Sequence, residues 1–113
     1  MRKVIQGVGL VGVLAVTLSV LLSAATAPVA DAAMKRDAAA VRALLKDGAE
    51  VNAAQGDGMT ALHWAARNGD ADLTQVLLFA GANVKASTRL GGYTPLLMAA
   101  QHGHAAVIAA LLS

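Results

Sequence analysis

The three histidines are the first residues whose chemistry could matter. His63 lies within an apolar run, and His102 and His104 are separated by a single glycine. Imidazole nitrogens bind zinc, but a zinc site takes three or four protein ligands, and no further ligand lies at a recognisable spacing. The chain has no cysteine, which excludes thiolate sites and disulfides. We therefore expect no metal site and no cofactor.

The carboxylates and hydroxyls make no better case for catalysis. Asp70 and Asp72 fall at a predicted helix start, where negative charge complements the helix dipole. No acidic pair is placed for acid–base work, and neither Thr60 nor Ser87 has an activating base. The Gly56–Gly58 loop lacks the lysine and the spacing of a phosphate-binding loop. We expect that the chain is not an enzyme and takes no small-molecule substrate.

The residues around His63 occur a second time. Residues 60–66 read Thr-Ala-Leu-His-Trp-Ala-Ala, and residues 94–100, a step of 34 later, read Thr-Pro-Leu-Leu-Met-Ala-Ala. Residues 48–51 recur at 81–84 with a step of 33, so one residue is inserted between the copies. A period of this length predicts a stacked array of helix pairs. We expect copies over about 27–51, 52–84 and 85–113, the last one truncated.

Each copy carries its own helix start and stop signals. Thr60 is placed to cap a helix over residues 61–68, and His63 can bond back to it in an arrangement like a capping box. Gly69 suits the left-handed conformation that ends a helix, and Asp70 can cap the next one. Each helix is short and marginal alone in water, so stacking must stabilise the array.

Apolar residues in these helices predict how the copies pack. Leu73, Val76, Leu77 and Ala80 form one stripe of the second helix. The alanine pairs (65–66 and 99–100) let neighbouring first helices approach closely, and the leucine pairs (44–45, 77–78 and 111–112) fill the layer between helices. We interpret Trp64, which occupies an apolar position, as a core residue rather than a partner contact.

The first 25 residues differ from the rest. A basic Met1-Arg2-Lys3 precedes 19 uncharged residues and then small residues, which predicts a signal peptide over 1–25 and a periplasmic or secreted protein. The apolar stretch is also long enough to span a bilayer, so a retained inner-membrane anchor is the alternative. Two of the nine Lys and Arg residues lie here, leaving seven against seven Asp and Glu. This balance predicts no surface for nucleic acid.

The part from residue 27 to residue 113 resembles the ankyrin-repeat family. The resemblance is carried by T-A-L-H-W-A-A-R-N-G at 60–69 and T-P-L-L-M-A-A-Q-H-G-H at 94–104, with the L-L and G-A pairs that follow. It implies an all-α solenoid with hairpin-like fingers, and a non-catalytic scaffold that binds a protein partner of unknown identity. It places partner contacts on the fingers and after each alanine pair, at Met34, Lys35, Gly56, Asp57, Met59, Arg67, Asn68, Arg89, Leu90, Tyr93, Gln101 and His102.

Some residues depart from the family pattern. Ala27, Ala30 and Arg36 stand where threonine, histidine and glycine are usual, so the first helix should be poorly capped. Leu97 replaces the histidine of the third copy, and the loop over 89–93 is one residue longer, so its finger should differ in shape.

The last predicted helix, residues 105–112, is apolar all round, whereas a terminal repeat normally has a polar outer face. We therefore expect a fragment that lacks the next repeat; an end covered by dimerisation is the alternative. Two other functional hypotheses stay open: the N-terminal recognition segment of a longer protein with an enzymatic part, and a membrane-tethered array.

Overall fold

The computed structural model describes residues 26–113, which form three consecutive helix pairs. The helices are α2 (Pro28–Met34), α3 (Ala38–Lys46), α4 (Ala61–Asn68), α5 (Ala71–Phe79), α6 (Pro95–Gln101) and α7 (Ala105–Leu112). Within this part of the chain there is no strand, so the predicted all-α fold is confirmed. The signal peptide or anchor predicted over 1–25 lies outside the described residues. No helix in residues 26–113 is long and apolar enough to cross a membrane.

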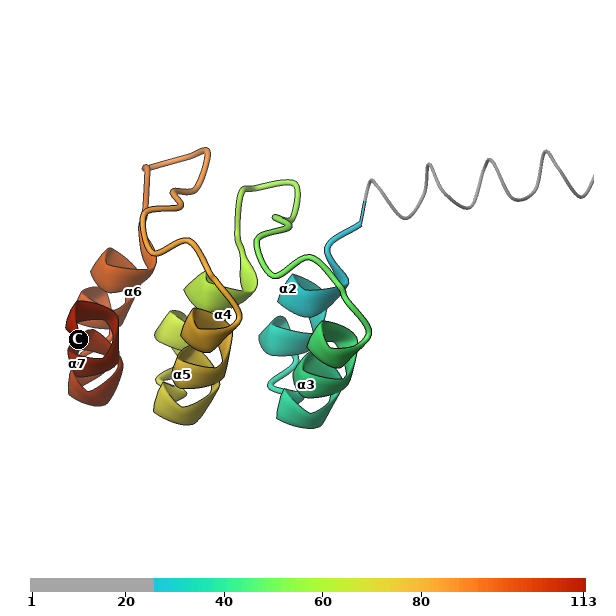
Figure 1. The fold of residues 1–113 in the computed structure, drawn as a ribbon. Coiled ribbons are helices and arrows are strands. Elements are labelled where there is room, and N and C mark those ends of the chain that lie inside the picture. The colour runs from blue at the N-terminus through green and yellow to red at the C-terminus, as the bar shows by residue number, and fades with distance from the viewer. Residues whose placement is uncertain (1–25) are drawn as a thin grey trace, which may run out of the picture.

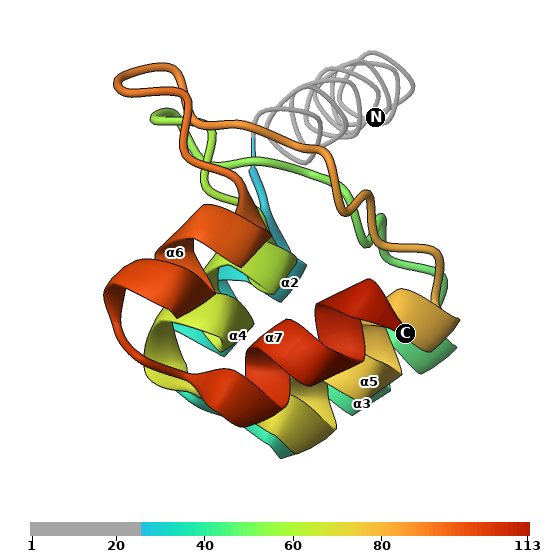
Figure 2. The same cartoon turned by 90° about the vertical axis from the view of Figure 1, so that its left-hand side faces the viewer.

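The pairs stack side by side in two layers. Helix α4 packs between α2 and α6, and α5 packs on α4 and α7 (Figure 1). Viewed along the stack, α2, α4 and α6 form one layer and α3, α5 and α7 the other (Figure 2). The loops over 47–60 and 80–94, which we call the first and second fingers, project from one side of the layers.

Helix α4 begins and ends where its sequence predicts. The Thr60 hydroxyl accepts from the backbone N–H of His63 at 3.4 Å, and His63 Nδ1 accepts from the N–H of Thr60 at 3.1 Å, which completes the capping box. Gly69 has φ 72° at the end of α4, and the carboxylate of Asp70 accepts from Leu73 N at 2.9 Å. The local signals of this repeat are confirmed.

The first helix of the first repeat, α2, is capped as poorly as expected. Ala27 has no side chain to cap α2, although Pro28 suits the first helical position. Arg36 has φ 59° in the turn that follows α2, a conformation that costs a residue with a Cβ roughly 1–2 kcal/mol.

The core lies between the layers. Leu62, Leu73 and Leu77 are buried with the alanines at 65, 66 and 99. Two expectations about the small residues are wrong. Ala80 is exposed because α5 ends at Phe79, before the stripe reaches it. Ala100 is exposed because, within residues 26–113, no further helix packs on that side of α6.

Hydrogen bonds tie the two fingers together. The side chain of Asn52 donates to the carbonyl of Gly81 at 3.1 Å and accepts from the N–H of Asn83 at 2.7 Å. Nearer the tips, the N–H of Arg89 donates to the carbonyl of Asp57 at 3.0 Å. The fingers therefore form one connected wall beside the helices.

The fingers differ in shape, as their lengths predict. The N–H of Gln55 donates to the carbonyl of Met59 at 2.9 Å, which closes the tip of the first finger. The equivalent bond in the second finger runs from Thr88 to Tyr93 at 3.0 Å and encloses one more residue. The extra residue enlarges this tip, where Leu90 lies.

Candidate functional site

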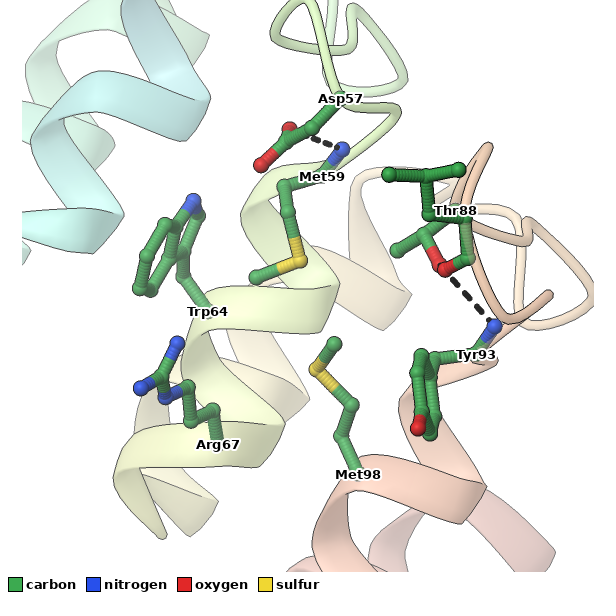
Figure 3. A pocket seen from close by; sticks show the side chains of 8 residues that line it. Asp57, Met59, Trp64, Arg67, Thr88, Tyr93 and Met98 are labelled. Atoms are coloured by element: carbon green, nitrogen blue, oxygen red, sulfur yellow. Dashed lines mark hydrogen bonds between the residues drawn. The ribbon is translucent and has the colours of Figure 1, made fainter.

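A groove of about 280 Å³ lies where the fingers meet α4 and α6 (Figure 3). The first finger contributes Asp57 and Met59, helix α4 contributes Trp64 and Arg67, the second finger contributes Thr88, Leu90 and Tyr93, and α6 contributes Met98. Residues from two neighbouring repeats therefore build one surface, and this surface exists only when the repeats are stacked.

Trp64 is held at one side of the groove by a chain of hydrogen bonds. Its Nε1–H donates to Gln55 Oε1 at 2.9 Å, and Gln55 Nε2 donates to Asp31 Oδ1 at 2.7 Å. The indole ring is only half-buried: it packs against the core and also lines the groove. The interpretation of Trp64 as a core residue therefore holds for the side of the ring that packs on the helices. It does not hold for the other side, which faces the groove.

Arg67 lies over the same indole. Its guanidinium carbon is 5.5 Å from the centroid of the Trp64 ring, within the range of a cation–π contact. The side chain is exposed, and among residues 26–113 its guanidinium has no ion pair and no hydrogen bond. The tryptophan thus orients a cationic group whose hydrogen-bond donors stay available to a ligand.

Two methionines lie in the middle of the groove (Figure 3). Met59 is 4% exposed, and its backbone N–H donates to the carboxylate of Asp57 at 3.0 Å. Met98 is half-buried and packs on the buried residues Ala66 and Val107. Methionine is flexible and polarisable, so this apolar surface can adapt to different side chains.

Hydrogen bonds within the second finger, and one from the buried ring of His63, hold the finger in place. The hydroxyl of Thr88 donates to the carbonyl of Leu90 at 2.8 Å and accepts from the N–H of Tyr93 at 3.0 Å. The ring of buried His63 holds the base of this finger, since its Nε2 donates to the carbonyl of Tyr93 at 2.7 Å. Leu90 is 86% exposed at the tip, so a large apolar side chain is presented to solvent on a supported loop.

His63 is held in one state by these bonds. Nδ1 accepts from the N–H of Thr60, so the ring is neutral with its proton on Nε2. Burial lowers the pKa of His63 below its ordinary value, and the hydrogen bond to the carbonyl of Tyr93 acts in the opposite direction.

The other two histidines also have structural roles: His104 joins two repeats, and His102 acts within its own. His104 Nε2 donates to the carbonyl of Arg67 at 2.9 Å and thereby joins the start of α7 to the end of α4. His102 Nδ1 donates to the carbonyl of Met98 at 2.9 Å, and its ring stacks on that of His104 with centroids 6.1 Å apart. Residues 26–113 contain no group of three or more residues that could hold a metal ion.

The predicted contact residues fall into two sets. The groove brings together Asp57, Met59, Arg67, Leu90 and Tyr93. The others lie outside it: Gly56 and Arg89 are exposed on the fingers, while Met34, Lys35, Gln101 and His102 are exposed at the ends of α2 and α6. Asn68 is half-buried, and its side chain donates to the carbonyl of Ala33 at 3.4 Å, so it joins repeats.

Thr88 and Met98 line the groove but were not predicted as contacts. Met98 aligns with Trp64 when the two copies are superimposed, since each is the fourth residue of its helix. The alignment was therefore a usable signal for Met98. Thr88 carried none, because its place depends on how the longer finger closes.

Comparisons with known proteins agree with this architecture. A family model described as Ankyrin repeats (3 copies) matches residues 26–113. The tyrosine-protein kinase Shark of Drosophila melanogaster is 36% identical over 81 residues, which cover 72% of this chain and 9% of the kinase. The potassium channel AKT3 of Oryza sativa subsp. japonica is 40% identical over 81 residues, covering 70% of this chain and 9% of the channel.

The E3 ubiquitin-protein ligase XBAT33 of Arabidopsis thaliana is 40% identical over 86 residues, covering 76% of this chain and 17% of the ligase. The chain thus spans less than a fifth of the length of each of these relatives. The similarity lies in the repeats, whose stacked helix pairs and fingers are those described above. The chain belongs to the ankyrin-repeat family.

Proposed function

We propose that this chain is a non-catalytic scaffold that binds another protein through the groove between the fingers and helices α4 and α6. Ankyrin repeats imply protein–protein interaction. The observation that supports this particular surface is its composition: tryptophan, arginine, tyrosine and methionine, all enriched in protein interfaces, converge there from two repeats. Neither nucleic acid nor a small-molecule substrate is part of the proposal.

The groove is also organised before any partner arrives. Gln55 holds the ring of Trp64, Thr88 closes the second finger, and His63 fixes the carbonyl of Tyr93. A surface whose side chains are already ordered loses less conformational entropy on binding. This favours recognition by a preformed surface over folding around the partner.

We also propose that the protein is exported. The support is the basic start followed by an uncharged apolar stretch and small residues, over residues 1–25. N-terminal sequencing of the protein from its native cells tests this. A new terminus near residue 26 is the expected result, whereas an intact Met1 would favour the membrane-tethered array instead.

A second candidate is the recognition segment of a longer protein. The support is that the kinase, channel and ligase named above match this chain over only 9–17% of their lengths. In this case any catalysis would belong to a part outside residues 1–113. Reading the open reading frame past Ser113 discriminates the two candidates, since an immediate stop codon would count against the second.

Site-specific cross-linking tests the binding surface itself. A photoreactive amino acid replaces Leu90, which is 86% exposed at the rim of the groove, or Arg42, which is exposed on α3 as a matched control. In the cells that produce the protein, we expect covalent protein adducts from position 90 and none from position 42. Equal adducts from both positions, or none from position 90, would contradict the proposal.

A further inference from the structure

We infer that the groove takes a segment of the partner that presents one large apolar side chain and an acidic one near it. This inference rests on the proposed function and adds the chemistry of the partner. It depends on three features of the described residues: the methionine-lined hollow, the unpaired guanidinium of Arg67, and the distribution of charge around them.

The hollow has room for one large side chain. Its volume is about 280 Å³, and an apolar cavity of about 150 Å³ already accepts a molecule the size of benzene. Met59 and Met98 lie in its middle, with the ring of Tyr93 at one side (Figure 3). A leucine, methionine or phenylalanine of the partner would therefore be enclosed on several sides by apolar atoms.

The cationic group next to this hollow lacks a partner of its own. Arg67 extends from α4 toward the ring of Trp64 (Figure 3), and in residues 26–113 no carboxylate pairs with it. Its guanidinium can bind a carboxylate through two parallel hydrogen bonds. Since Trp64 already orients the side chain, little further ordering is needed.

The charges nearby favour an acidic partner over a basic one. Helices α4 and α6 contain no Asp or Glu. Among the residues that line the groove, Asp57 is the one carboxylate; it lies on the first finger, and its Oδ1 accepts from the N–H of Met59 at 3.0 Å. On the helix side of the groove, a lysine of the partner would therefore find no carboxylate, whereas an aspartate or glutamate would find Arg67.

Selection from a random peptide library tests this chemistry. The full 113-residue chain is immobilised and exposed to phage-displayed linear dodecapeptides, in parallel with its Arg67→Gln variant and with Arg42→Gln as a matched control on α3. We expect the unaltered chain and Arg42→Gln to enrich peptides that carry a Leu, Met or Phe close to an Asp or Glu. The Arg67→Gln variant should enrich the apolar residue without the acidic one.

Synthetic copies of an enriched peptide give the size of the effect. Replacing its acidic residue by Lys should weaken binding to the unaltered chain about tenfold or more, since a charge-assisted hydrogen bond is lost and a like charge is introduced. The same replacement should change binding to Arg67→Gln by less than about threefold. Replacing the apolar residue by Ser should weaken binding to both proteins, because this residue fills the hollow and not the arginine site.

Failure of this inference can be told apart from failure of the proposed function. Three results would overturn the inference that the partner segment is acidic and apolar. These are enrichment of basic peptides, an undiminished preference of Arg67→Gln for acidic peptides, or no enrichment at all. The proposed protein-binding surface would still stand if position 90 gave adducts and position 42 gave none. Circular dichroism of both glutamine variants must match that of the unaltered chain, since both arginines are exposed.

Discussion

The middle repeat and the last repeat have nearly the same sequence pattern but very different burial. Leu62 of α4 is 1% exposed, whereas Leu96, its counterpart in α6, is 37% exposed. His63 is fully buried, and Leu97 at the same position is 43% exposed. The more hydrophobic side chain is thus the more exposed one, so burial here does not follow from residue type.

The difference comes from the neighbours. Helix α4 is covered by α2 on one side and α6 on the other, while in residues 26–113 the main contacts of α6 are with α4 and α7. The open side of the last repeat holds an apolar hollow of about 290 Å³, lined by Val84, Lys85, Thr94, Leu96, Leu111 and Leu112. In such an array, the free energy of unfolding is approximately the sum of the stability of each repeat and of the interfaces between adjacent repeats. The middle repeat has an interface on both sides.

Truncating the paired leucines should give the largest contrast. Leu62→Ala removes a fully buried side chain and leaves a cavity, so we expect a loss of about 3 kcal/mol in the free energy of unfolding. Leu96→Ala removes a side chain that is already partly in water, and should cost about 1 kcal/mol. Chemical denaturation followed by circular dichroism measures both. Equal losses would mean that the open side of α6 is covered in solution.

The glycines that end α4 and α6 offer the next contrast. Gly69 and Gly103 have almost the same backbone, with φ 72° and 70°. A Cβ added at Gly69 would lie 2.6 Å from Nδ1 of His104, whereas one at Gly103 would meet nothing within 4 Å. The ring of His104 cannot turn away without losing its bond to the carbonyl of Arg67.

We therefore expect Gly69→Ala to cost about 2–3 kcal/mol, from backbone strain and the lost hydrogen bond together. Gly103→Ala should cost only the strain, about 1 kcal/mol. Thermal unfolding of the two variants measures the difference. If Gly69→Ala cost as much in a His104→Ala background as it does in the unaltered chain, the contact with the imidazole would not be the cause.

The same contrast explains what the sequence could predict. The bounds of α4 were predictable because Thr60, His63 and Gly69 act through bonds to backbone atoms within a few residues. Cap signals of this kind do not depend on the neighbouring repeats, so the fold followed from the period and the caps. The poorly capped first helix and the longer second finger were predictable for the same reason.

The groove was only partly predictable, because it is made between repeats. Arg67 and Tyr93 were predicted as contacts. The alignment of the copies could have added Met98, but nothing in the sequence indicates that Met98 lies between them or that the ring of Trp64 has one open side. Asn68 was predicted as a partner contact, and nothing local indicated that its side chain also reaches the carbonyl of Ala33 in the preceding repeat. Such contacts join residues 30 to 35 positions apart in the chain. The repeat period shows which residues occupy equivalent positions, but it does not show which way their side chains point.

Exchanging the residues at the histidine position should sharpen the comparison further. In His63→Leu the N–H of Thr60 loses its buried acceptor and the carbonyl of Tyr93 loses a donor, so we expect a loss of about 2 kcal/mol. The reverse change, Leu97→His, lies on the open side and should stay within about 0.5 kcal/mol of the unaltered chain. Denaturant midpoints at neutral pH measure both variants.

His63 also predicts how stability depends on pH. Its pKa is lowered in the folded state, so the unfolded chain binds the proton more readily. Stability should be full above the pKa of the unfolded histidine, roughly 6.5, and should fall as the pH drops below it toward the folded pKa. Unfolding measured from about pH 8 down to about pH 5, on either side of the pKa of the unfolded histidine, should show this decline. The decline should persist in His102→Gln and shrink in His63→Gln; the reverse result would assign it to another group.

The helix caps should give the smallest contrast, because a cap acts within its own repeat. Thr60→Val removes an acceptor that is buried and also bonds to the ring of His63 at 2.9 Å, so we expect a loss of about 1 kcal/mol or slightly more. Thr94→Val removes only the bond to the N–H of Leu97 at 3.2 Å, in a half-buried setting, and should cost about 0.5 kcal/mol. If the two losses were equal, the network around His63 would add nothing to the cap, and the excess stability of the middle repeat would come from apolar packing alone.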